Sequence, residues 1–298
     1  MTLITVQGLR KSYGAREVLH GIDLTVDDSE IVGVLGPNGS GKTTTVECIG
    51  GLRKPDAGTI RIAGIDPASR KSGLRQILGM QLQQCRLPAK TTPSEALDLF
   101  AAFYPDPRPA GELLERFGLT SQANQYFEKL SGGQQQRLSI ALALVGRPKV
   151  AILDELTTGL DPAARRDIWT YLEDLAEEGT TILLVTHSME EASYLCDRVY
   201  ILDAGRIVAN GTPAELASSG GSQVISFMPS APIDPSTLLR LPGITSVTAE
   251  GGRVVILGDS AAPQRILAAL VADGVTANQL RVSGPTLDDA YLRVTEEN

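Results

Sequence analysis

The chain has 298 residues, of which 42% are hydrophobic and only 4% aromatic, so aliphatic side chains must build its core. Its formal net charge of −8 argues against a general nucleic-acid-binding protein, because such proteins usually carry a basic stripe. Three widely separated cysteines and two histidines argue against a zinc site. The sequence shows no signal-peptide pattern and no apolar run near the ~20 residues that span a bilayer.

The first predicted elements are strands separated by turns, and they lead to a glycine-rich segment. Residues 31–35 are apolar and run directly into GPNGSGKTT at residues 36–44, and TTTVECIGGL at residues 43–52 continues as a helix. A strand, a glycine-rich loop and a helix in this order are the context that a phosphate-binding P-loop requires. An ordinary glycine turn is the alternative, and the flanking strand and helix argue against it.

The glycine-rich segment matches the phosphate-loop pattern GxxxxGK[ST]. Gly36, Gly39 and Gly41 allow the backbone to turn its N–H groups toward a phosphate. Lys42 is expected to reach the β- and γ-phosphates of a nucleotide, and the Thr43 hydroxyl is expected to ligate Mg²⁺.

The middle of the chain is predicted to be helical. SEALDLFAAF places Ala96, Leu97, Leu99 and Phe100 on one side of a helix, and GELLERFGL follows after a proline-rich break. LSGGQQQR at residues 130–137 then precedes a further helix. The serine and glycines of LSGGQQQR suit the binding of an anion by backbone N–H groups at a helix N-terminus. The chain therefore carries two predicted phosphate-binding loops.

Two apolar strands then end in polar side chains. KVAILDE ends in Asp154 and Glu155, which fits a buried strand with Asp154 as a Mg²⁺ ligand and Glu155 placed to orient or deprotonate water. A solvated acidic turn is the alternative. TTILLVTH ends in His187, which could hydrogen-bond a γ-phosphate or hold Glu155 and the water in place, although a lone histidine is more often structural. His20 is interpreted as structural.

The last part of the chain is predicted to form a separate unit. Residues 197–211 form a hairpin that turns at Ala204 and Gly205, and the composition changes near Ser218, after which lysine is absent. We expect a domain over residues 1–217, with a helical insertion over about 88–147, and a small α+β domain over residues 218–298. The expected fold is α/β: a P-loop NTPase core with a mostly parallel sheet and N-terminal antiparallel strands.

These motifs, in this order, closely resemble the nucleotide-binding subunit of an ATP-binding cassette (ABC) transporter over about residues 3–215. GPNGSGKTT resembles its Walker A segment, VAILDE its Walker B segment, LSGGQ its signature and TGLD its D-loop. The resemblance implies ATP and Mg²⁺ as cofactors, an adenine stacked on Tyr13, and His187 as a switch histidine. The implied ATP-binding residues are Tyr13, Gly36, Pro37, Asn38, Gly39, Ser40, Gly41, Lys42, Thr43, Thr44, Ser131, Gly132, Gly133, Gln134 and Asp161.

The family also has a glutamine loop, for which GMQLQQC offers Gln81, Gln83 and Gln84. The alignment selects Gln83, with Gln81 as the alternative register, and the resemblance implies that this glutamine contacts Mg²⁺ or water. The expected metal ligands are then Thr43, Gln83 and Asp154. The expected catalytic residues are Glu155, His187 and Gln83. Leu156, where the family more often has proline, is expected to affect only the turn.

The resemblance further implies a head-to-tail dimer in which each ATP lies between the Walker A segment of one copy and LSGGQ of the other. It also implies a separate membrane permease that docks near residues 83–105 and keeps the chain at the cytoplasmic face of the membrane. Residues 81–104 and the C-terminal tail resemble the corresponding parts of bacterial exporter ATPases that handle drugs, antibiotics, lipids or polysaccharides. The alternatives are a soluble ABC ATPase that acts on nucleic acid or ribosomes, and an importer ATPase. No nucleic-acid partner is expected.

Overall fold

The computed structural model describes residues 1–69, 72–81, 86–157, 159–218 and 223–296, and the chain divides into two compact units, Met1–Thr212 and Pro213–Asn298. The larger sheet of the first unit has the strand order β5-β6-β7-β3-β8-β9. These strands are Leu78–Gln81 (β5), Val150–Asp154 (β6), Thr181–Thr186 (β7), Ile31–Leu35 (β3), Arg198–Asp203 (β8) and Arg206–Gly211 (β9). Neighbouring strands from β5 to β8 are parallel, and β9 returns antiparallel to β8.

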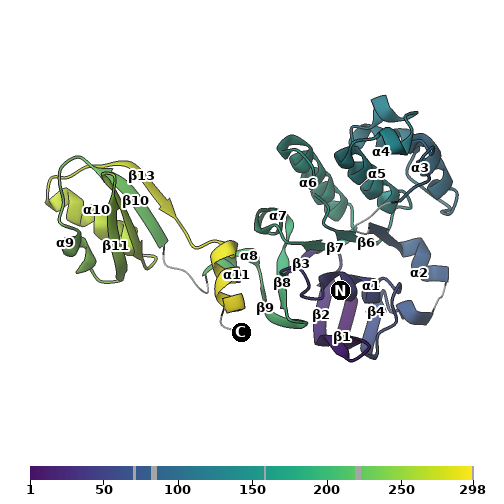
Figure 1. The fold of residues 1–298 in the computed structure, drawn as a ribbon, viewed down its shortest axis with the longest axis horizontal. Coiled ribbons are helices and arrows are strands. Elements are labelled where there is room, and N and C mark those ends of the chain that lie inside the picture. Colours follow the sequence, from purple (N-terminus) through teal and green to yellow (C-terminus); the bar gives the residue numbers. More distant parts are fainter. Residues whose placement is uncertain (70–71, 82–85, 158, 219–222, 297–298) are drawn as a thin grey trace. The chain divides into compact units, whose positions relative to one another are not determined.

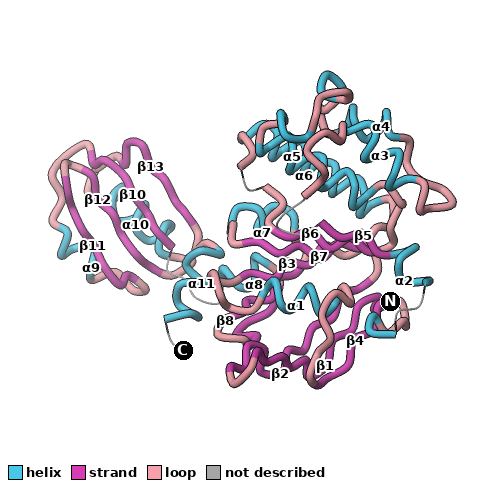
Figure 2. The backbone as a smooth tube through the Cα atoms, turned by 45° about the vertical axis from the view of Figure 1, so that its right-hand side comes forward, coloured by secondary structure: helices cyan, strands magenta, loops and turns pink. Residues whose placement is uncertain are grey.

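A smaller antiparallel sheet of order β2-β1-β4 faces the larger one, with β1 at Thr2–Tyr13, β2 at Arg16–Asp27 and β4 at Ala57–Ile62. Helix α1 (Lys42–Ile49) lies between the two sheets (Figures 1 and 2), where Val46 and Ile49 join one apolar cluster with side chains of both. Helices α6 (Pro162–Glu177) and α7 (Met189–Leu195) cover the opposite face of the larger sheet. Because both of its faces are covered, every residue of β3, β6 and β7 is buried.

The remaining helices of the first unit are α2 (Ser72–Ile77), α3 (Pro93–Ala101), α4 (Ala110–Arg116) and α5 (Gly132–Leu144). Helices α3, α4 and α5 pack against one another (Figure 1). The prediction for Leu99 is wrong: α3 buries Ala96 and Leu97, whereas Leu99 is 58% exposed. Leu99 lies about 200° around the helix from Leu97, so one covered stripe cannot include both.

The second unit has an antiparallel sheet of order β11-β12-β10-β13, formed by Ile244–Glu250, Arg253–Gly258, Gln223–Pro229 and Ala277–Ser283. Helices α9 (Pro235–Leu239) and α10 (Ala262–Ala272) cover one face, and Ile225, Phe227 and Ile266 centre the core between them. Helices α8 (Pro213–Ser218) and α11 (Leu287–Glu296) pack against each other. The sequence did not predict α9. Among the described residues, no helix is long and apolar enough to span a membrane.

Candidate active site

Three adjacent parallel strands bring the predicted site residues to one edge of the larger sheet. Strand β7 lies between β3 and β6, and Leu35 and Asp154 pair with Thr186 and Val185 at the carboxyl ends of these strands. Residues that follow such strands gather at one edge, where α/β proteins bind their ligands. The phosphate loop, Glu155 and His187 therefore meet there, although they are far apart in the sequence.

The phosphate loop folds as the glycine pattern predicts. Gly39 and Gly41 have φ angles of 84° and 108°, which side chains other than glycine rarely adopt. A Cβ at Gly36 would collide with the carbonyl oxygen of Leu202. The Lys42 Nζ donates to the carbonyl oxygens of Gly36 and Pro37, at 2.7 and 3.0 Å. The lysine thus lies over the concave side of its own loop, where a phosphate would bind.

The two expected metal ligands in the described residues are next to each other. The Thr43 Oγ1 donates to the Asp154 Oδ2 at 3.5 Å, although 111 residues separate them. Asp154 is only 1% exposed, and burial, followed by the nearby charge of Glu155, raises its pKa to about 6. Burial also lowers the pKa of Lys42, against the opposing effect of Glu155 and Asp154. Hydroxyl and carboxylate oxygens are ligands that Mg²⁺ prefers, so this pair fits the ion.

Glu155 and His187 form the second part of the site. The backbone of Glu155 has a φ angle of 50°, a conformation uncommon outside glycine, and its N–H donates to the Val185 carbonyl at 2.8 Å. This turn places the Glu155 Oε1 3.5 Å from the Nδ1 of His187. The Gln136 side chain holds the same turn, because its Nε2 donates to the carbonyls of Glu155 and Leu156, both at 3.1 Å. Gln136 was not predicted from the sequence.

A cleft of about 430 Å³ joins Tyr13 to the phosphate loop and Glu155. Its lining residues are Tyr13, Arg16, Val18, Asn38, Gly39, Gly41, Lys42, Thr43, Thr44 and Glu155. The Tyr13 ring is partly exposed, its hydroxyl lies 3.4 Å from the Thr44 Oγ1, and the Arg53 guanidinium lies 5.0 Å from the ring centroid. Arg16, Val18 and Arg53 were not predicted, because no local motif marks them.

The signature residues form the start of α5 and not part of this cleft. The Ser131 Oγ accepts from the Gln134 N–H at 3.3 Å, and the Gln134 Oε1 accepts from the Ser131 N–H at 2.8 Å. This reciprocal pair is a capping box. Among the described residues that line the cleft, none belongs to 131–134. One chain therefore presents its phosphate loop and its signature helix at two separate places.

Asp161 has a structural partner in its own chain. Its carboxylate caps α6 by accepting from the N–H groups of Ala163 and Ala164, at 3.1 and 2.9 Å, and these bonds, that from Ala164 first, lower its pKa. Its contact with a nucleotide stays a prediction.

Of the glutamine candidates, Gln83 and Gln84 lie outside the described residues, and only Gln81 can be placed. Gln81 is buried at the end of β5, and its Oε1 accepts from the Asp154 N–H at 3.1 Å. Gln81 therefore helps to hold the metal-binding strand end, and the role of Gln83 stays a prediction.

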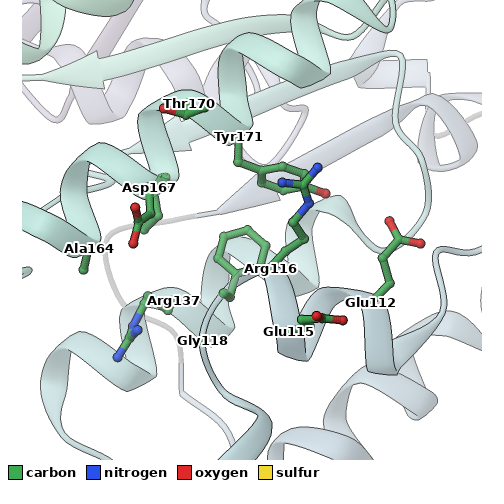
Figure 3. A pocket seen from close by; sticks show the side chains of 11 residues that line it. Glu112, Glu115, Arg116, Gly118, Arg137, Ala164, Asp167, Thr170 and Tyr171 are labelled. Carbon is green, nitrogen blue, oxygen red and sulfur yellow. The ribbon is translucent and has the colours of Figure 1, made fainter.

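A larger pocket of about 650 Å³ lies between α4, α5 and α6 (Figure 3). Arg137 from α5 and Asp167 from α6 lie on its two sides, and Arg116 lies over the ring of Tyr171, 5.2 Å from the centroid. None of the predicted site residues lines it. The phosphate loop and Glu155 line the smaller cleft, which is therefore the candidate active site.

A P-loop beside a buried strand that ends in two carboxylates defines the class of P-loop nucleoside triphosphatases. The ABC transporter family model matches residues 19–158. The daunorubicin resistance ATP-binding protein DrrA3 of Streptomyces coeruleorubidus is 36% identical over 307 residues, covering 100% of this chain and 97% of the relative. The Nod factor export ATP-binding protein I of Rhizobium meliloti is 37% identical, covering 98% and 88%.

Solved structures agree with these relatives. An ATP-binding subunit of an ABC transporter superposes with a TM-score of 0.68 and 31% identity, covering 73% of this chain and 92% of that one. A dimeric ATP-binding cassette in a post-hydrolysis state with ADP and Pi gives 0.65 and 29%, covering 70% and 98%.

The chain therefore belongs to the ABC transporter family, and within it to the ATP-hydrolysing subunits of the exporter subgroup. The predicted fold class is confirmed. The relatives favour an exporter over the importer and the nucleic-acid alternatives.

Proposed function

We propose that two copies of this chain bind two ATP molecules between them, and that hydrolysis drives a separate permease that exports a drug-like, lipid or polysaccharide substrate. The observation that carries the chemistry is the grouping of Lys42, Thr43 and Asp154 beside Glu155, with His187 3.5 Å from the Glu155 carboxylate. Nothing else in the described part of the chain combines a phosphate loop with a possible base.

In this proposal each site residue has a defined role in ATP binding or hydrolysis. The phosphate loop and Lys42 bind the β- and γ-phosphates, and Tyr13 stacks on adenine. Mg²⁺, held by Thr43, Asp154 and Gln83, would neutralise negative charge on the phosphates. Glu155 orients the attacking water and accepts its proton, and His187 holds Glu155 and the γ-phosphate in place.

Separate positions of the two loops favour a composite site. Ser131 and Gly132 are exposed, and the first N–H groups of a helix have no partner within the helix. The N–H groups of Gly132 and Gly133 and the dipole of α5 can therefore bind the γ-phosphate of an ATP on a second copy. Two equivalent sites related by a twofold axis follow. The dimeric cassette among the solved structures supports this arrangement.

Exposed apolar side chains support a permease contact near residues 83–105. Leu99 and Phe103 are both exposed, although each is large and apolar. Apolar exposure of this kind often marks a protein contact. Docking there would hold the chain at the cytoplasmic face of the membrane. The domain over residues 218–298 would either reinforce the dimer or regulate it.

The test is Glu155→Gln in the full-length chain. We expect loss of ATP turnover by about 100-fold or more, because the water loses its base. ATP should still drive dimerisation, since the phosphate loop is unchanged. Phosphate release and light scattering measure the two properties, and Glu115→Gln on the exposed face of α4 is the matched control. Normal hydrolysis by Glu155→Gln would refute the assigned role.

A further inference from the structure

Glu191, in the first turn of α7, is a fully buried carboxylate that the proposed chemistry does not use. It is 0% exposed, and its Oε1 accepts from the indole Nε1 of Trp169 at 3.2 Å. Its Oε2 is also buried and has no hydrogen-bond partner among the described residues. A buried carboxylate costs free energy unless donors satisfy it. The indole of Trp169, the only tryptophan of the chain, is thus the donor that the described structure supplies.

Further contacts between α6 and α7 surround this hydrogen bond. The ring of Tyr194 on α7 stacks on the Trp169 indole, with centroids 4.9 Å apart and planes inclined by 27°. The Arg165 side chain on α6 pairs with Glu190 on α7 at 3.0 Å. Figure 1 shows the two helices on the same face of the sheet. Together these contacts fasten α7 to α6 along most of the length of α7.

Glu191 is also bonded to the turn that carries His187. The Ser188 Oγ accepts from the Glu191 N–H at 3.3 Å and caps α7, and the Ser188 N–H donates to the Thr186 Oγ1 at 2.9 Å. His187 lies between Thr186 and Ser188, and its own side chain is largely exposed. The position of the imidazole therefore depends on the first turn of α7, and that turn is anchored through Glu191.

We propose that Trp169 is a positioning residue for ATP hydrolysis: its hydrogen bond to Glu191 fastens α7 to α6 and so holds the His187 imidazole beside Glu155. This inference rests on the proposed function of His187. Trp169 does not touch the nucleotide cleft, so its removal affects the turnover step and leaves ATP binding unchanged.

The experiment compares variants of the full-length chain at saturating and limiting ATP. Trp169→Phe keeps an aromatic ring against Tyr194 but removes the N–H donor. We expect kcat to fall about 10-fold, since small misplacements of a catalytic group have effects of this size or larger, and KM for ATP to stay within about twofold. Glu191→Ala should behave alike, whereas Glu191→Gln keeps an acceptor oxygen and should retain most of kcat. Tyr194→Phe is the matched control.

His187→Ala separates positioning from a general structural effect. In that background Trp169→Phe should cause no further fall in kcat, because the group that it positions is gone. An equal further fall would show a merely structural role and overturn the inference. So would an unchanged kcat in Trp169→Phe and Glu191→Ala while His187→Ala is impaired. If His187→Ala itself hydrolyses ATP normally, the proposed function of His187 fails instead.

Trp169 emission provides a second measurement, because no other tryptophan contributes. Glu191→Ala should shift the emission maximum and lower kcat together, and Glu191→Gln should change both much less. This comparison holds even if Trp169→Phe does not fold. A loss of kcat in Glu191→Ala with unchanged emission would contradict the proposed link between the indole and His187.

Discussion

Two ionisable side chains of the site, Asp154 and Lys42, are almost completely buried. Burial is the largest cause that raises the pKa of Asp154 to about 6, and burial lowers the pKa of Lys42. The folded-state pKa of Asp154 exceeds its unfolded value of 3.8. The folded protein therefore binds this proton more tightly than the unfolded chain does. The resulting stability is complete below the unfolded pKa and is lost as the pH rises through about 6.

Asp154→Asn should remove the loss of stability that accompanies ionisation of Asp154 at higher pH. In the absence of nucleotide and Mg²⁺, we expect the variant to unfold at a higher temperature than the wild type at pH 8, with a difference of about 3 kcal/mol in the free energy of unfolding. The difference should shrink as the pH falls toward 4. Thermal unfolding across this pH range measures it, with the exposed Asp106→Asn as control. A difference that grows toward acid pH would contradict the assignment.

Among the helices and strands, α5 connects the signature to the metal-binding edge. It begins at the capping box of Ser131, and its far end lies against β5, where a Cβ at Gly79 would collide with the Ala143 carbonyl oxygen. The same strand ends at Gln81, whose side chain bonds the backbone of Asp154. The close approach at Gly79 therefore sets where α5 sits relative to β6.

Gly79→Ala should destabilise the protein by about 2 kcal/mol, because backbone must move to admit the methyl group. Urea unfolding measures the free energy. Gly73→Ala is the matched control: it lies in α2, its nearest contact is the Ile65 side chain at 3.7 Å, and alanine favours a helix. We expect the control to be neutral or slightly stabilising. Equal stabilities of the two variants would refute the close packing of α5 on β5.

At the scale of the whole molecule, the phosphate loop and the signature helix do not share a cleft. Under the proposed composite site, a single copy therefore holds two incomplete sites. Mixing two inactive variants tests this. Lys42→Ala removes a phosphate ligand, and Ser131→Arg blocks the signature, so each alone should be inactive.

A mixed dimer combines one wild-type phosphate loop with one wild-type signature. With random pairing, we expect ATPase activity of up to about a quarter of wild type from an equal mixture. Phosphate release, measured on the mixture and on each parent variant, tests whether two copies share an active site. An equal mixture no more active than its parents would contradict the composite site.

Features encoded in short stretches were predictable from the chain. GPNGSGKT, the strand that ends in Asp154 and Glu155, the strand that ends in His187 and the hairpin at Ala204 and Gly205 each depend on neighbouring residues. Side chains within a few positions decide strand, loop and helix there, and the structure has each element where the pattern places it.

Contacts across the sequence were not predictable. The bond of Gln81 to Asp154, the bonds of Gln136 to the Glu155 turn and the bond of Trp169 to Glu191 join residues 73, 19 and 22 positions apart. Leu99 was misassigned because α4 and α5, and not the local pattern, determine which side of α3 is covered. Sequence motifs name the groups that can bind ATP and hydrolyse it. Packing fixes the distances between them, because burial and long-range hydrogen bonds exist only once the strands are side by side.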